Sequence, residues 1–453
     1  MSESNATAGS PEPPADPSPA TSPDGPPVAP PSVVRNPDFM RLWAAETISQ
    51  FGTQISLLAL PLIAVVLLQA SPIEVALLGT IEFLPFILFS LPAGAWVDRL
   101  RRRPILILGD LGRAAVLATV PLAFVADVLT IYQLYVVGFV AGTLTVLFDV
   151  AYQSYLPSLV ERDQLVDGNG KLEVSRTLAQ TAGPALGGGV IGLLTAPVAI
   201  IADALSFVVS ALFVIAIRRH EPTPDRHRDE HGRERGGLRS EVIDGLRYVL
   251  GNRFLRGIAA STATSNLFSS IAFATFIVYA VRELGLDAAE IGLVFGLGNL
   301  GAIVGALAAS RLASALGLGR TIVLSMALSA PGILLVALAP REAPIPFLIA
   351  SGLLTGLSAV VYNINQVSFR QAITPTAMQG RMNATMRFIV WGTIPRGQIL
   401  GGAIATAVSL TAAIWVGAIG SFLAVVPLLI TPVHTLQEMP APADDEVPAT
   451  PIA

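Results

Sequence analysis

The feature that most constrains this chain is the recurrence of long apolar stretches along its whole middle part. Each stretch is at least about 20 residues long, which is enough for a helix to cross a hydrocarbon core of about 30 Å. The composition agrees, because 53% of the residues are hydrophobic and only 13% are charged, which is unusual for a soluble protein. The sequence therefore predicts a membrane protein.

We predict twelve membrane-spanning helices, with boundaries good to about 3 residues. Their predicted ranges are 41–68, 74–97, 104–126, 131–157, 168–194, 196–218, 257–281, 287–312, 319–339, 345–370, 380–407 and 410–432. A charged linker, 219–256, separates the first six spans from the last six. The expected fold class is an all-α membrane protein with two six-helix halves, residues 35–218 and 257–433.

The segments outside the spans are polar. Residues 1–34 are rich in proline and poor in apolar side chains, and 434–453 are rich in proline and acids, so both are predicted to be disordered tails. The first tail lacks the basic start and apolar core of a secretory signal. The second part of the linker, SEVIDGLRYVLGNRFLRG, repeats apolar residues at helical spacing, which predicts a surface helix against the membrane.

The distribution of basic residues predicts the orientation. Placing the N-terminus inside puts the arginine cluster 99–103 and the basic linker on the inner side, and leaves only Arg282 and Arg341 among the loop arginines outside. We therefore expect both termini in the cytoplasm of a bacterial cell, with the chain in the cytoplasmic membrane. The chain has no cysteine, which excludes disulfides, thiol catalysis and iron–sulfur clusters.

The stretch GAWVDRLRRRP, residues 94–104, places four arginines and an aspartate at the end of a predicted span. One interpretation is that the arginines only anchor this loop in the cytoplasm. The order of residues also resembles the signature loop of the major facilitator superfamily between spans two and three, where it implies a conformational gate. The matching residues are Gly94, Asp98, Arg99, Arg102 and Arg103. Arg101 departs from the pattern, because the family prefers glycine there.

Internal repetition supports two related halves. Arg176 precedes Pro184 in span five at the same separation as Arg387 precedes Pro395 in span eleven. Two halves related by a shift of six spans are the parallel repeat that this superfamily implies.

Span five also contains GPALGG, which resembles an element of the exporting antiporters of the superfamily. The matching residues are Gly183, Pro184, Gly187 and Gly188. The alternative interpretation is that these residues only allow close helix packing. Further stretches, such as AYQSYLPSLV and NQVSFRQAITP, resemble the bacterial branch that includes macrolide and enterobactin exporters.

Export against a gradient needs an energy source, and the chain contains no phosphate-binding Gly-x-x-x-x-Gly-Lys-Ser/Thr loop. A carboxylate inside the membrane is then the expected proton carrier. Glu46 begins a polar stripe with Gln50 and Gln54 on span one, which faces either a cavity or other helices. Glu82 in span two has no basic residue near it in sequence. We predict these two glutamates as the proton-coupling residues.

The remaining acids within the spans have simpler interpretations. Asp110 with Arg113, and Glu173 with Arg176, are spaced as local ion pairs. Asp149 is expected to approach Arg113, and Asp203 is expected to pack span six.

Two contacts between the halves are predicted. Asp98 is expected to meet the N-terminus of span eleven and favour closure on the cytoplasmic side. Glu82 and Arg396 lie at similar depths of about 12 and 16 Å in spans two and eleven, so we expect an ion pair between them. The alternative is that Arg396 faces the cavity and binds an anionic substrate.

The predicted function is proton-driven export of small amphiphilic molecules, such as an antibiotic, a siderophore or another natural product. The C-terminal half would offer polar and aromatic contacts to the substrate through Asn266, Asn363, Asn365, Gln366 and Trp391. The alternatives are an uptake symporter and a non-transporting receptor or scaffold. We expect a monomer that acts on a small molecule and protons in a lipid bilayer, is not an enzyme, and uses no cofactor, metal or nucleic acid.

Overall fold

A computed structural model describes residues 33–97, 100–161, 164–219, 221 and 238–438. Residues 1–32 and 439–453 of the predicted tails and residues 220 and 222–237 of the linker lie outside these residues, as do Asp98 and Arg99 of the predicted gate. The described part of the chain is helical and contains no strand, which confirms the all-α class.

The N-terminal helices follow the predicted spans to within a few residues. They are η1 (Val33–Arg35), α1 (Pro37–Leu62), η2 (Ile63–Leu67), α2 (Pro72–Val97), α3 (Arg102–Val125), α4 (Ile131–Leu159), α5 (Leu165–Leu194) and α6 (Ala196–Ala216). Several of them start at a residue suited to a helix N-terminus. The side chain of Asn36, for example, accepts hydrogen bonds from the backbone N–H groups of Asp38 and Phe39.

The C-terminal elements repeat this arrangement with more interruptions. They are α7 (Leu238–Gly251), α8 (Arg253–Arg282), α9 (Ala288–Gly298), α10 (Leu300–Leu316), α11 (Leu318–Ala337), α12 (Pro344–Ala372), α13 (Thr376–Trp391), α14 (Thr393–Ala407), α15 (Leu410–Ser421), η4 (Phe422–Val425), α16 (Val426–Leu429) and η5 (Pro432–Thr435). Predicted span eleven is divided at Gly392 because Pro395 has no N–H to donate to the carbonyl of Trp391.

Within the described residues, ten helical stretches are long and apolar enough to span a membrane. The expected number of twelve is therefore not confirmed by length and composition. The remaining two segments of the bundle are α5 and the pair α13 and α14, which are the repeat-related spans five and eleven. They carry charged side chains such as Glu173, Arg176 and Arg387, and these lower the hydropathy of both segments.

Helix α7 is the surface helix expected in the linker. It packs on α13 at the end of the C-terminal half. Its Asp244 carboxylate lies 3.7 Å from the guanidinium of Arg381, and the Tyr248 hydroxyl donates a 3.3 Å hydrogen bond to the carbonyl of Ile373. The helix is therefore held by the protein, whereas its contact with a membrane remains a prediction.

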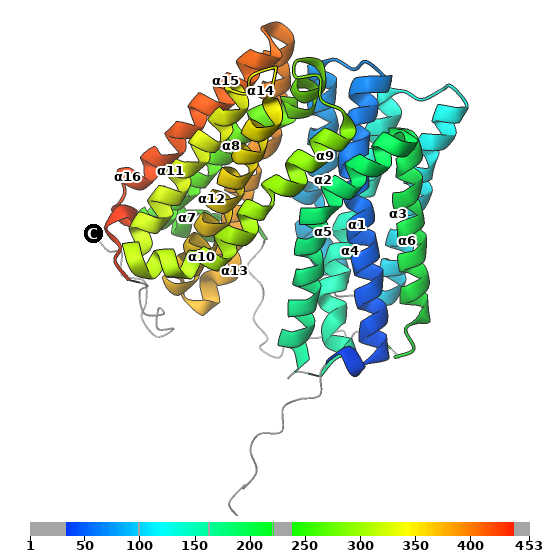
Figure 1. Cartoon of the computed structure of the whole chain (residues 1–453). Coiled ribbons are helices and arrows are strands. Elements are labelled where there is room, and N and C mark those ends of the chain that lie inside the picture. The colour runs from blue at the N-terminus through cyan, green and yellow to red at the C-terminus, as the bar shows by residue number, and fades with distance from the viewer. Residues whose placement is uncertain (1–32, 98–99, 162–163, 220, 222–237, 439–453) are drawn as a thin grey trace, which may run out of the picture.

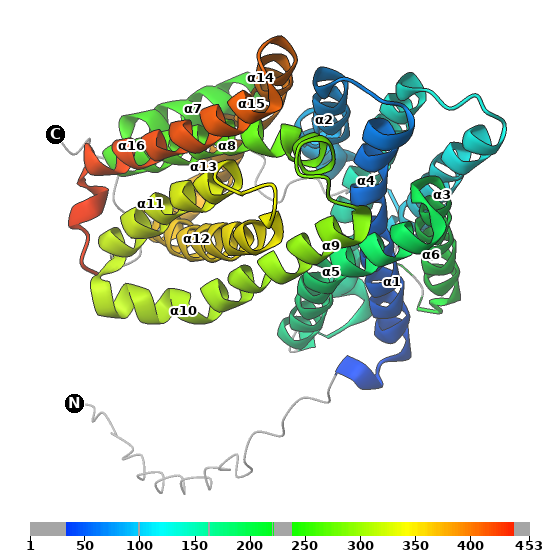
Figure 2. The ribbon, with the colours of Figure 1, turned by 45° about the horizontal axis from the view of Figure 1, so that its top comes forward.

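The two halves meet at one end of the bundle and diverge toward the other (Figure 1). We define two ends of the bundle. The linker face is the end that contains η1, the end of α6 and η5. The sealed face is the opposite end. Figure 2 shows helices α9 and α5 running side by side where the halves join. Each half also has its own apolar cluster near the linker face, one around Phe39 and Tyr155 and the other around Phe369 and Met382.

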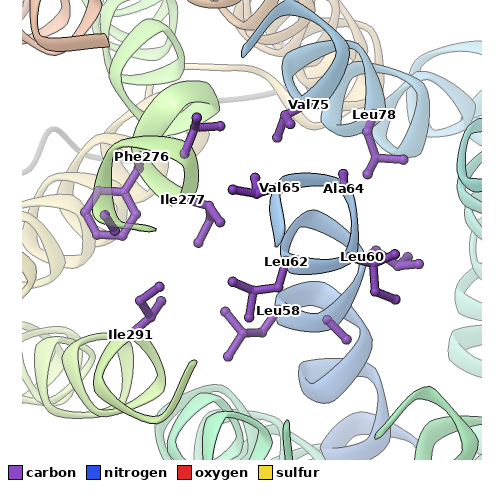
Figure 3. Close-up of a cluster of buried hydrophobic side chains, with 14 of the residues drawn as sticks. Leu58, Leu60, Leu62, Ala64, Val65, Val75, Leu78, Phe276, Ile277 and Ile291 are labelled. Carbon is purple, nitrogen blue, oxygen red and sulfur yellow. The ribbon is translucent and has the colours of Figure 1, made fainter. Parts of the chain in front are cut away.

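The sealed face is closed by an apolar cluster that draws on both halves. In Figure 3, Leu58 and Leu62 of α1 point toward Ile277 of α8 and Ile291 of α9, while Val65 lies beside them. All five side chains are less than a tenth exposed. Close van der Waals packing of these side chains contributes to holding the halves together at this end.

Two glycine-lined seams extend this closure. A Cβ added to Gly188 of α5 would lie 2.3 Å from the carbonyl oxygen of Ala288 and 2.9 Å from the Cα of Gly292, both in α9. A Cβ added to Gly402 of α14 would lie 2.9 Å from the Cα of Ile73 in α2. Small residues therefore let the backbones of the two halves approach closely at both seams.

Hydrogen bonds also cross between the halves. The guanidinium of Arg282, at the end of α8, donates a 2.8 Å bond to the carbonyl of Ala70, just after η2. The backbone N–H of Ile73 donates to the hydroxyl of Thr406 at 3.2 Å, and the Asn299 amide donates to the carbonyl of Gln180. These bonds lie at or toward the sealed face, so the described conformation is closed there.

Candidate substrate cavity and buried carboxylates

A cavity of about 690 Å³ lies within the C-terminal half, among α8, α11, α12 and α13. This volume is in the range of small-molecule sites. Its lining is mixed, with methionine, valine and tryptophan beside amides, hydroxyls and two arginines. The lining residues include Thr262, Asn266, Tyr362, Asn363, Gln366, Arg370, Asn383, Met386, Arg387, Val390 and Trp391.

Four of the predicted substrate contacts line this cavity. They are Asn266, Asn363, Gln366 and Trp391. Asn365 does not line it, because its side chain is buried and its amide donates to the carbonyl of Val361. Gln50 and Gln54 also lie elsewhere, in the N-terminal half, where Gln54 packs against Gly183 of α5. Within this stripe, Gln54 therefore contacts another helix, while Gln50 bonds to Glu46 of its own helix.

Hydrogen bonds hold several of the lining groups in place. The hydroxyls of Thr262 and Tyr362 share a 2.7 Å bond between α8 and α12. The amide of Asn266 donates to the carbonyl of Val390 at 3.1 Å, which ties α8 to the end of α13. The cavity wall is thus held across three helices rather than by one flexible segment.

Sequence reasoning missed the arginines of the cavity. The sequence predicts no cavity role for Arg370, and Arg387 is identified there only as a marker of the internal repeat. Their helical spacing was the available signal, because Asn383, Arg387 and Trp391 recur every four residues on one face of α13. The guanidinium of Arg387 lies over the ring of Trp391, 5.5 Å from its centroid.

The N-terminal half contains a different set of charges, centred on Glu46. This side chain is 6% exposed, and its Oε1 accepts a 2.6 Å hydrogen bond from the amide of Gln50. Its Oε2 has no hydrogen-bond partner among the described residues. Asp149 and Arg113 both lie within electrostatic range of it. Glu46 is therefore a buried carboxylate in a polar environment with one oxygen unsatisfied.

The predicted local pair of Asp110 and Arg113 is present. The guanidinium lies 2.5 Å from one carboxylate oxygen of Asp110, and the other oxygen accepts a 2.7 Å bond from Ser210 of α6. Arg113 also lies over the rings of Phe148 and Phe207, at 4.4 and 4.1 Å from their centroids. This arginine is held by an acid and two aromatic rings, which suits a buried cation.

The other acids in the N-terminal spans differ in whether they have a hydrogen-bond or ion-pair partner. Asp203 of α6 accepts hydrogen bonds from Ser56 of α1 and from Ser206, so it joins the two helices as expected. Asp149 lies within electrostatic range of Arg113 and Arg176. The expected ion pair of Glu173 and Arg176 is not formed: both side chains are exposed on α5, and the bridges of the described residues do not include them.

The expected ion pair of Glu82 and Arg396 is absent from the described conformation. Helices α2 and α14 are neighbours as predicted, but the Glu82 side chain turns toward Gly138 of α4. Arg396 is exposed and does not line the cavity, so its alternative role in substrate binding is also unsupported. The face of α14 that meets α2 carries Gln398 and Gly402 instead.

The predicted gate loop is described only in part. Gly94 lies near the end of α2, and Arg102 and Arg103 begin α3. The backbone N–H groups of these two arginines donate to the carboxylate of Glu221 at 2.6 and 3.1 Å. Arg103 also donates from its side chain to the carbonyls of Val214 and Ile215 in α6. Both arginines are therefore bound within their own half.

The GPALGG element lies where α5 contacts two helices. Gly183 and Gly187 face α1, since added Cβ atoms would lie 2.5 Å from Gln54 and 3.2 Å from the Cα of Ile55. The carbonyl of Pro184 and the backbone of Gly188 face α9 across the seam between the halves. The element thus joins one helix of its own half and one of the other.

Comparison with known proteins begins with a family model described as transmembrane secretion effector, which matches residues 27–453. The multidrug efflux pump Tap of Mycobacterium tuberculosis is 26% identical over 390 residues, which cover 83% of this chain and 89% of Tap. Tap of Mycolicibacterium fortuitum is also 26% identical over 390 residues, which cover 83% of this chain and 91% of that protein.

Solved structures share the fold at lower identity. A bacterial homologue of the iron transporter ferroportin in its inward-facing state aligns with a TM-score of 0.70 and 16% identity, over 88% of this chain and 99% of that one. The outward-facing state of such a homologue aligns with a TM-score of 0.55 and 16% identity, over 86% and 98%. The nucleoside transporter NupG aligns with a TM-score of 0.63 and 13% identity, over 86% and 97%.

Proposed function

We propose that this chain, which belongs to the transmembrane secretion effector family of the major facilitator superfamily, exports small amphiphilic molecules in exchange for protons. The family and the efflux pumps that resemble the chain identify it as a transporter rather than an enzyme. It is a multi-pass membrane protein. Export, proton coupling and the chemical nature of the substrate are the proposal.

The orientation proposed here places the linker face in the cytoplasm. Among the described arginines, the linker face carries Arg35, Arg102, Arg218, Arg253 and most of the others, while the sealed face carries Arg282 and Arg341. Basic residues are retained on the cytoplasmic side of a membrane. With this orientation the described conformation is closed to the outside, as expected of an exporter that is ready to load from the cytoplasm.

The observation that carries the proposal is the buried carboxylate of Glu46 in a bundle whose two halves are packed together at the sealed face. A carboxyl group in this position can hold a proton in one conformation and release it in another. Its partner Gln50 and the nearby Arg113 make both protonation states possible without a permanent ion pair. Glu82, which likewise lacks an ion-pair partner in the described conformation, remains the second candidate.

A cycle follows from these features. Substrate enters the cavity of the C-terminal half from the linker face while Glu46 releases its proton to the cytoplasm. The sealed face then opens, which requires the apolar cluster and both glycine seams to separate. A proton from outside binds Glu46 and the substrate leaves, after which the sealed face closes again. Alternating access of this kind is rigid-body movement of one half against the other.

The direct test is transport in everted membrane vesicles that contain the full chain and are energised by respiration. We expect them to accumulate an amphiphilic fluorescent dye, such as a rhodamine methyl ester, and to lose it when nigericin removes the pH gradient. Accumulation only in right-side-out vesicles would favour the uptake symporter. Accumulation that survives nigericin would contradict proton exchange, and no transport at all would favour the receptor or scaffold.

A further inference from the structure

The two arginines of the cavity have no counter-charge among the described residues. Arg370 of α12 and Arg387 of α13 both line the cavity, and its described lining contains no aspartate or glutamate. Neither arginine takes part in any of the ion pairs of the described residues. An arginine within a membrane bundle ordinarily lies beside a partner charge or a polar cavity. Here the cavity itself is the environment of both cations.

The contacts of Arg370 indicate a site for a ligand group that accepts hydrogen bonds. Its side chain is partly buried, and its Nε is buried with no hydrogen-bond partner among the described residues. One turn away, Gln366 donates to the Asn363 side chain. Arg370 also lies within electrostatic range of Arg387, so the two positive charges repel one another.

The chemistry of the guanidinium group identifies the class of ligand. Arginine presents a planar set of donors that matches the paired oxygens of a carboxylate or a phosphate. Arg387 stands against the ring of Trp391, and Val390 and Met386 line the same wall. The cavity thus offers cationic donors beside an apolar and aromatic surface.

We propose that this cavity is a binding site for amphiphilic organic anions, with the carboxylate or phosphate group held between Arg370 and Arg387 and the apolar body against Trp391. This inference rests on the proposed export function and narrows its substrate class. The same chemistry is carried by soluble metabolites and by anionic lipid headgroups, and the experiment separates these two sources.

The experiment measures binding to the purified full chain in phosphatidylcholine nanodiscs by fluorescence anisotropy. The probes are fluorescein and a rhodamine methyl ester, which share a xanthene ring system but carry a net negative and a net positive charge. We expect fluorescein to bind the wild type more tightly. Arg370→Gln and Arg387→Gln should each weaken fluorescein binding about tenfold or more, because each removes a charged hydrogen-bond donor.

Two controls separate recognition from misfolding and from a general loss of charge. Arg311→Gln removes the same charge from an exposed position of α10 outside the cavity, and it should leave fluorescein binding unchanged. Arg370→Lys keeps the charge but loses the planar donor set, and it should recover part of the affinity. Monodisperse protein with an unchanged melting temperature is required of every variant.

The source of the anion is tested by adding phosphatidylglycerol to the nanodiscs. If this lipid displaces fluorescein from the wild type, the site accepts a lipid headgroup, and if it does not, the site takes soluble anions; both results support an anion site. Equal affinity of the wild type for the two dyes, no fluorescein binding, or a fluorescein preference that survives Arg370→Gln with Arg387→Gln would overturn the inference. If one of these results is obtained and vesicles still export the rhodamine ester, the anion site is wrong but the proposed export function is retained.

Discussion

The two halves of this bundle share one helical frame but carry opposite charges near their centres. In the N-terminal half, the carboxylates of Glu46, Asp110 and Asp149 surround Arg113. In the C-terminal half, Arg370 and Arg387 line a cavity with no acidic residue among its described lining. The two halves therefore have similar helical frames, but the side chains placed on those frames give each half a different distribution of charge.

The largest effect is expected at the carboxylate of the N-terminal half. Glu46→Gln should lower export driven by a pH gradient by about 5- to 150-fold, the range of ordinary coupling energies, because the amide cannot exchange a proton. Downhill exchange of substrate should persist. The measurement is dye accumulation in everted vesicles. Glu173→Gln removes an exposed carboxylate of α5 and should behave as wild type, and equal losses in both variants would remove the special role of Glu46.

The next effect concerns the seam between the halves. Gly188→Leu should open the sealed face, because its side chain would collide with Ala288 and Gly292 of α9. Overpacking of this kind costs about 1–3 kcal/mol. Gly189→Leu is a matched control, since a Cβ added there meets no atom within 4 Å.

Accessibility of a single introduced cysteine measures this opening. The chain has no cysteine of its own, so Leu62→Cys in the sealed cluster can be labelled without background from the protein. Labelling from the sealed face should accelerate in Gly188→Leu and remain slow in Gly189→Leu. Similar labelling rates in the two variants would show that the seam does not hold this face closed.

A smaller effect is expected at the hydrogen bond that crosses to the N-terminal half. Arg282→Gln should raise the labelling rate at the same cysteine by about fivefold, since a charged donor to the carbonyl of Ala70 is lost. Arg341 is the comparison, because its ion pair with Glu283 is largely exposed and stays within the C-terminal half. Surface pairs contribute little, so Arg341→Gln should leave the labelling rate near the wild-type value. The reverse order would contradict the assignment.

The smallest effect is expected within one half. The Glu221 carboxylate accepts hydrogen bonds from the backbone N–H groups of Arg102 and Arg103 at the start of α3. Glu221→Gln replaces it with a neutral amide and should lower the free energy of unfolding by about 1 kcal/mol. The readout is thermal unfolding in detergent, with Glu161→Gln as the exposed control. Labelling at the sealed face should not change. An altered labelling rate would mean that this contact is part of the gate after all.

The sequence predicted the helices well because hydropathy and length decide which segments can cross a membrane. The predicted ranges match the helices of the structure to within a few residues, apart from the interruptions. Those interruptions were not predicted. The break before Pro395 has a local cause in the missing N–H, whereas the break at Asn299 lies where its side chain donates to Gln180 of another helix.

The side-chain predictions succeeded or failed according to the helix face. Position along a span gives the depth of a residue, but its contacts depend on its angle around the helix. Arg396 lies two residues from Gln398, which is a rotation of about 200°, so it points away from the face that meets α2. The two residues of the predicted pair therefore lie at matching depth, but Arg396 lies on the wrong face of its helix to meet Glu82.

The cavity residues show the same limit of prediction from sequence, which gives the depth of a residue but not the direction of its side chain. Asn266, Asn363, Gln366 and Trp391 were predicted because polar and aromatic residues within a span stand out in the sequence. Arg370 was missed because it lies close to the end of a span, where arginine ordinarily anchors a helix at the membrane surface. Only the packing of α12 against its neighbours shows that its side chain turns into the cavity.

Under the two proposals, proton coupling belongs to Glu46 and anion recognition to the C-terminal cavity. The most direct test compares Glu46→Gln with Arg387→Gln in the same everted vesicles, recording uphill accumulation of fluorescein and of the rhodamine ester together with downhill exchange. We predict that Glu46→Gln loses uphill accumulation of both dyes but keeps exchange and the preference for fluorescein. Arg387→Gln should lose that preference and keep its response to the pH gradient. If Glu46→Gln changes the dye preference, or Arg387→Gln removes the response to the gradient, the two tasks are not divided between the halves.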